Sequence, residues 1–146
     1  CYVQSTAQND IGLFSLENVA TTSISGTIYG VNLITQAREN VSGTSDYRVR
    51  IKDGGTNLDT VGENLGTADS IRGIFSTTSP ANGIAWTTTD LNALEGGGVD
   101  AGTTVLRLNW VTVEVDYIPS AAVSPSIFRG VLFNGKIRIF GKTIIR

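Results

Sequence analysis

The stretch from Thr103 to Ile118 reads TTVLRLNWVTVEVDYI, and it decides the fold class. In its second half apolar and polar residues alternate, which is typical of a β-strand with one buried face. The apolar members of this half are Val111, Val113, Val115 and Tyr117. In the first half the apolar residues, Leu106, Leu108 and Trp110, have the opposite parity. Either both faces are covered there, or a β-bulge near Asn109 changes the inward side.

Two segments upstream show the same alternation. Residues 47–52 follow it strictly, with Tyr47, Val49 and Ile51 predicted to face inward and Arg48, Arg50 and Lys52 to face water. Residues 28–38 alternate with Tyr29, Val31, Leu33, Thr35 and Ala37 on one face. From these patterns we expect four side chains to be largely buried: Trp110, Val113, Val115 and Val49.

Shorter strands and turns fill the intervals. Asp53-Gly54-Gly55 predicts a turn that requires positive φ, with a hairpin partner at residues 57–61. Further strands are expected at residues 13–16 and 70–75. Many short strands joined by glycine-rich turns indicate an all-β sandwich.

One short helix is expected within residues 86–96. Thr87 can cap its start, and Asp90 stands three residues on, as in a capping box. Leu91 and Leu94 give the helix one apolar edge, which predicts that it closes an end of the sandwich. The run Gly96-Gly97-Gly98 is interpreted as the helix C-cap and a loop, because it lacks the Lys and Ser/Thr of a phosphate loop.

The composition argues against an enzyme. The chain has no His and a single Cys, at position 1, so it lacks the usual acid–base residue and the side chains of a structural zinc site. Glu114 and Asp116 are the best candidates for paired carboxylates, but on one strand face they are interpreted as solvated surface positions. Calcium needs only oxygen ligands, and Asp53, Asp59 and Asp100 are its candidates, without EF-hand spacing. No cofactor and no metal site are predicted.

The charges divide the chain into an acidic body and a basic tail. Residues 119–146 hold five of the 11 bases and no acid, whereas all 13 acids lie upstream. Residues 119–126 have linker composition, and Asn134-Gly135 between apolar runs predicts a β-hairpin. We therefore expect a sandwich over residues 1–118, a linker over 119–126 and a β-arm over 127–146 that contacts a neighbouring subunit, with docking of the arm on its own sandwich as the alternative. The predicted contact residues are Arg129, Val131, Phe133, Lys136, Ile137, Arg138, Ile139 and Lys142.

Residues 11–118 resemble a jelly-roll-like β-sandwich domain of bacteriophage virion and tail-associated structural proteins. The resemblance rests on residues 13–18, 28–31, 47–51 and 111–117, and above all on the order Ser79-Pro80 to Trp86-Thr87 followed by Asp90-Leu91-Asn92-Ala93. It implies an all-β antiparallel sandwich and a component of a virion surface, fibre or tail. It implies no catalytic residues.

The function expected from these observations is architectural, in a virion or another extracellular assembly. The expected partners are copies of the chain and other proteins of the particle, with no nucleic acid and no membrane span. The alternatives are a subunit of a cell-surface filament and a glycan- or receptor-binding module on a fibre. The aromatic candidates for a sugar platform are Tyr2, Tyr29, Tyr47, Trp86, Trp110 and Tyr117, for which core packing is the simpler interpretation. Cys1 is either a lipidated first residue or the start of a trimmed chain.

Overall fold

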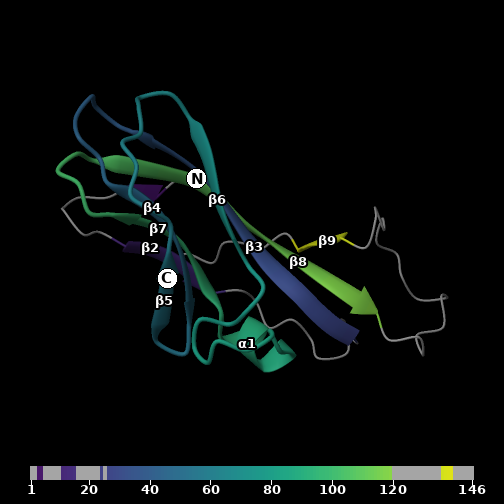
Figure 1. Cartoon of the computed structure of the whole chain (residues 1–146). Helices are drawn as coiled ribbons and strands as arrows, with labels where there is room; N and C mark the ends of the chain where they lie inside the picture. Colours follow the sequence, from purple (N-terminus) through teal and green to yellow (C-terminus); the bar gives the residue numbers. More distant parts are fainter. Residues whose placement is uncertain (1–2, 5–10, 16–23, 25, 120–135, 140–146) are drawn as a thin grey trace.

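The computed structural model describes residues 3–4, 11–15, 24, 26–119 and 136–139 of the chain (Figure 1). These residues form nine strands and one short helix. The elements are β1 (Val3–Gln4), β2 (Ile11–Ser15), β3 (Gly26–Glu39), β4 (Tyr47–Asp53), β5 (Thr56–Asp59), β6 (Ser70–Ser76), α1 (Thr88–Ala93), β7 (Glu95–Asp100), β8 (Leu106–Pro119) and β9 (Lys136–Ile139).

The strands form two antiparallel sheets packed as a sandwich. The five-stranded sheet has the order β1-β8-β3-β6, with β9 also on β8, and the four-stranded sheet has the order β2-β7-β4-β5. Without β9, the eight strands β1–β8 are divided four and four and have the order of a jelly roll, in which successive strands repeatedly cross between the sheets. The predicted fold class is confirmed. Of the predicted C-terminal hairpin, only β9 lies within the described residues.

The pairing of β3 with β8 is interrupted by two bulges. Gln36 pairs with Trp110 but Ala37 pairs with Leu108, so Asn109 is the extra residue. This is the second of the two alternatives for the stretch, and it explains why both parities carry buried residues. The bulge turns Trp110 outward, so the prediction that Trp110 is buried is wrong. A second bulge at Tyr29 likewise exposes that side chain, which was predicted to share the face of Val31.

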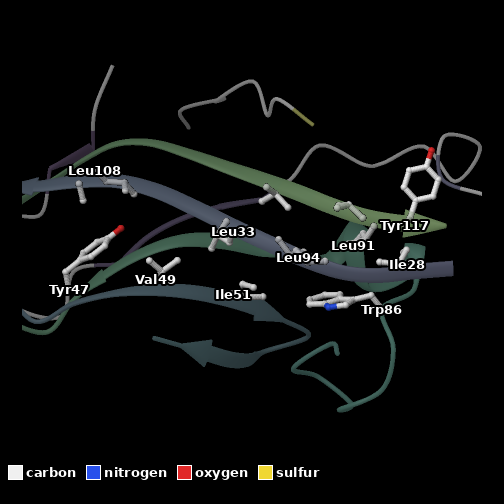
Figure 2. Close-up of a cluster of buried hydrophobic side chains, with 14 of the residues drawn as sticks. Ile28, Leu33, Tyr47, Val49, Ile51, Trp86, Leu91, Leu94, Leu108 and Tyr117 are labelled. Carbon is white, nitrogen blue, oxygen red and sulfur yellow. The ribbon is translucent and has the colours of Figure 1, made fainter. Parts of the chain in front are cut away.

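The core lies between the inner faces of the two sheets. Val49, Val113 and Val115 are buried as predicted, and so are the inward residues Tyr47 and Ile51 of β4. Figure 2 shows Leu33 of the five-stranded sheet above Val49 and Ile51 of the four-stranded sheet. Across this core the Tyr47 hydroxyl donates a hydrogen bond of 2.7 Å to Oγ1 of Thr35, which joins the two sheets.

The glycine run Gly96-Gly97-Gly98 belongs to β7, a central strand of the four-stranded sheet, and not to a loop. That prediction is wrong for a steric reason. A Cβ at Gly96 would lie 2.6 Å from the side chain of Leu33, and one at Gly98 would lie 2.6 Å from the ring of Tyr47. The side chain of Leu33, from β3 in the facing sheet, and the ring of Tyr47, from the adjacent strand β4, therefore fill the space that side chains of β7 would take.

The N-terminus of the helix is capped as predicted, whereas its C-cap is Leu94 and not the glycine run. Thr87 and Asp90 form a capping box, in which Oγ1 of Thr87 accepts from the Asp90 N–H and Oδ2 of Asp90 accepts from the Thr87 N–H. Leu91 and Leu94 are buried beside Trp86, whose Nε1 donates to the carbonyl of Ser76 (Figure 2). The helix thus covers one end of the core.

Candidate functional site

The outer face of the five-stranded sheet is ordered in rows across β6, β3 and β8. Ile71, Gln36 and Trp110 are register partners in one row. The next two rows are Gly73, Ile34 and Thr112, and then Phe75, Asn32 and Glu114. These residues alternate with buried ones along their strands, so their side chains leave the core.

Large apolar side chains gather on this face. Of the eight large hydrophobic residues exposed in the described part of the chain, five lie on it. Their exposed fractions are 62% for Tyr29, 60% for Ile71, 50% for Phe75, 39% for Trp110 and 63% for Ile118. The Phe75 ring lies over Gly30, where a Cβ would be only 2.4 Å from the ring. This face therefore presents aromatic and aliphatic side chains to the surroundings.

Polar groups border and interrupt the apolar residues. Nδ2 of Asn32 donates to Oε2 of Glu114 at 3.3 Å, which holds the two side chains together across β3 and β8. At the other end of the face, Asp69 accepts a hydrogen bond of 2.7 Å from Asn109 and lies 3.6 Å from the guanidinium of Arg38. The face is thus a mixed apolar and amide surface with charged side chains at its ends.

The outer face of the four-stranded sheet is different. Its bases come from the outward positions of β4, and each is paired with an acid. Arg48 binds Asp46 at 2.8 Å, Arg50 binds Asp59 at 2.6 Å, and Lys52 binds Glu95 at 2.9 Å. The two hydrogen bonds that the Arg50 guanidinium donates to the Asp59 carboxylate raise the pKa of Arg50. On this face the bases of β4 are paired with acids, and the Arg50–Asp59 pair is less exposed than the other two pairs.

The C-terminal strand β9 pairs with β8 along the edge that faces away from β3. Beyond β1, which pairs with residues 107–108, β9 runs antiparallel to residues 113–116. Four of the predicted arm residues form this strand: Lys136, Ile137, Arg138 and Ile139. The remaining predicted arm residues, Arg129, Val131, Phe133 and Lys142, lie outside the described residues. In a single chain the strand pairs with its own sandwich, and its contact with a neighbouring subunit stays a prediction.

The candidate carboxylates and calcium ligands are dispersed. Glu114 and Asp116 lie on the outer face, one row apart on β8. Asp53 is buried and accepts from the Ser79 hydroxyl, and Asp59 pairs with Arg50. Asp100 lies opposite Tyr47, at the other end of the β4–β7 pair from Asp53. Within the described residues there is no group of three His, Cys, Asp or Glu side chains that could hold a metal ion.

The six aromatic candidates do not form one platform. Tyr47, Trp86 and Tyr117 are core residues, and Tyr2 lies outside the described residues. Tyr29 and Trp110 are exposed on the outer face, where sequence reasoning missed their companion Phe75. The signal for Phe75 was the alternation of residues 70–75, in which it shares the parity of Ile71.

Comparisons with known proteins leave the fold as the firmest assignment. A scan of protein-family models, a search of curated proteins and a search of solved structures each found no match. In the described part of the chain, no helix has the length and hydrophobicity needed to cross a membrane.

Proposed function

We propose that this protein is a structural subunit of a virion or another extracellular assembly, which packs against a second copy through the outer face of its five-stranded sheet. The observation that carries the proposal is the exposed group of Tyr29, Ile71, Phe75 and Trp110 on that face. Soluble monomers rarely expose contiguous apolar patches larger than a few hundred Å², and larger patches mark interaction sites. The opposite face of the sandwich, whose bases are paired with acids, serves as the solvated side.

The residue types on the face suit a protein partner. Aromatic side chains are enriched in the cores of protein interfaces, where they bury large areas and keep a polar atom for hydrogen bonding. Burial of apolar area contributes about 25 cal/mol per Å², so covering several such side chains adds a few kcal/mol to association. Ile71 and Ile118, both aliphatic and more than half exposed, gain most from this kind of contact.

A non-enzymatic role agrees with the residues available. The chain has no His, and Glu114, the best carboxylate candidate, accepts a hydrogen bond from Asn32 on an outward sheet face. Two carboxylates across a cleft would be needed for glycoside hydrolysis, and Glu114 and Asp116 are neighbours on one strand instead. We expect a broad screen of glycoside and ester substrates to show no turnover.

The assignment to a virion rests on the resemblance to phage structural domains. The most specific part of that resemblance is the segment from Ser79 to Asn92, in which the buried Trp86 and the capped helix close one end of the sandwich. A subunit of a cell-surface filament would use the same surface, and the two are distinguished by which particle contains the protein.

The second candidate function is glycan binding by the same face. Trp110 and Phe75 offer aromatic rings for stacking, and Gln36, Asn32 and Thr112 lie between them as hydrogen-bonding groups. Glycan-array binding that is lost on Trp110→Ala, by a protein that stays monomeric, would favour this function over self-assembly.

The experiment for the proposed function is light scattering on the double variant Ile71→Thr, Trp110→Ser. We expect the wild-type chain to form an oligomer and the variant to lose mass while keeping its β-sheet circular dichroism. The matched control is Lys52→Ser on the ion-paired face, which should assemble like the wild type. A variant that assembles as well as this control contradicts the proposal.

A further inference from the structure

The strand β9 matches the edge of β8 residue by residue. The register sets Arg138 opposite Glu114 and Lys136 opposite Asp116, so a basic residue type is paired with an acidic one at the two outward positions of the segment 113–116. At the alternate positions Ile139 is the register partner of Val113, and Ile137 is the register partner of Val115. The side chains of Val113 and Val115 are buried. Opposite charges and matched apolar residues in cross-strand pairs specify this pairing and its register.

The chain between the two strands is far longer than their pairing requires. Adjacent antiparallel strands are usually joined by loops of about two to five residues. Here β8 ends at Pro119 and β9 begins at Lys136, so residues 120–135 connect them. Sixteen residues can span up to roughly 55 Å, which exceeds the width of a domain of this size, roughly 38 Å.

The length of this connection alone allows β9 to reach the sandwich of a neighbouring copy. A neighbouring copy offers β9 the same acids and the same backbone edge as its own chain does.

We propose that β9 is exchanged between copies, so that the C-terminal strand of one subunit pairs with residues 113–116 of β8 in the next. The partner is therefore a second copy of this chain, and the contact is strand addition to a sheet edge. The inference rests on the proposed function, because packing through the outer face brings a neighbour's edge within reach and lets exchange compete with closure inside one chain.

Disulfide trapping between two differently tagged chains tests the exchange. Both chains carry Cys1→Ser; one has Glu114→Cys and the other Arg138→Cys, at positions that are register partners. Directly opposite residues in an antiparallel pair are about 4.5–5.5 Å apart at Cα, within the range for a disulfide. The expected result is a disulfide that joins the two tags as the main oxidised product.

The control replaces Glu114→Cys with Asn57→Cys, an exposed position on the edge strand of the other sheet, which reports random collisions. The proposal is overturned if the joined product does not exceed this control. It is also overturned if a chain carrying both Glu114→Cys and Arg138→Cys closes its disulfide only within itself. Light scattering on the same samples separates the two proposals, since an oligomer without interchain disulfide leaves face packing standing, whereas a monomer contradicts both.

Discussion

The two outer faces of this sandwich come from equally regular alternation, yet they are built for different surroundings. On the four-stranded sheet, the outward residues of β4 are bases, and acids on β5, on β7 and before β4 pair with them. On the five-stranded sheet, the outward residues of β6, β3 and β8 include Ile71, Ile34, Phe75 and Trp110. Ile71, Phe75 and Trp110 are at least 39% exposed among the described residues. This difference is the reason that the five-stranded sheet is the one proposed as the contact surface.

The largest expected effect separates the inner from the outer face of β8. Val113→Asp would place an unpaired carboxylate in the core and should lower the free energy of unfolding by more than about 4 kcal/mol, enough to prevent folding. Thr112→Asp, one residue earlier and facing outward, should change it by less than about 1 kcal/mol. Urea unfolding measures both. Folded, soluble Val113→Asp protein would show that the assignment of faces is wrong.

The next effect concerns the hydrogen bond that joins the two sheets. Burial raises the pKa of Tyr47 to about 12 from 10.0, although its hydrogen bond with Thr35 acts in the opposite direction. A raised pKa means that the unfolded state ionises first, so the stabilising contribution is complete below pH 10 and is lost as the pH rises toward 12. The loss should approach about 3 kcal/mol. Thermal melts between pH 9 and pH 12 should show it, and Tyr47→Phe should lose less stability over this window.

A smaller effect is expected at the glycine strand behind the ion-paired face. Gly96→Val would press a side chain against Leu33 and should cost about 1–3 kcal/mol of unfolding free energy. Gly66→Val is the matched control, because a Cβ there meets nothing within 4 Å. Equal stability of the two variants in guanidinium unfolding would mean that the sheets do not approach as closely as described.

The smallest expected effect lies on the ion-paired face itself. Asp59→Asn removes the charge that Arg50 binds through two hydrogen bonds, and should cost about 1 kcal/mol or less. Glu95→Gln should cost less still, because its pair with Lys52 is more exposed. Neither substitution should change the oligomeric state in light scattering. If either substitution dissociates the oligomer, the contact surface lies on the four-stranded sheet and not on the five-stranded sheet.

Strict alternation of apolar and polar residues allowed strands and their buried faces to be predicted directly from the sequence. Residues 47–52 were predicted with their correct faces, because every outward position is charged and every inward one is apolar or aromatic. The capped helix and the Gly54-Gly55 turn followed from local chemistry, with both glycines at positive φ. These features depend on neighbours in sequence.

The predictions were wrong where contacts between residues distant in sequence determine the structure. The glycine run in β7 was interpreted as a loop because the reason for it lies in Leu33 and Tyr47 of other strands. Trp110 was expected in the core because sequence alone left open the bulge at Asn109, which reverses the face. The outer-face surface was missed for the same reason, since it requires the register between β3, β6 and β8. Which copy receives β9 depends on association, which a single chain does not specify.

Fluorescence of Trp110 tests the central claim most directly, because assembly through the outer face must cover this partly exposed side chain. In a Trp86→Phe chain, Trp110 is the sole tryptophan. The account predicts that its emission shifts to the blue and that acrylamide quenching falls as protein concentration rises. The complementary Trp110→Phe chain reports the buried Trp86 and should show neither change. Quenching of Trp110 that stays constant while the mass measured by light scattering increases would contradict the account.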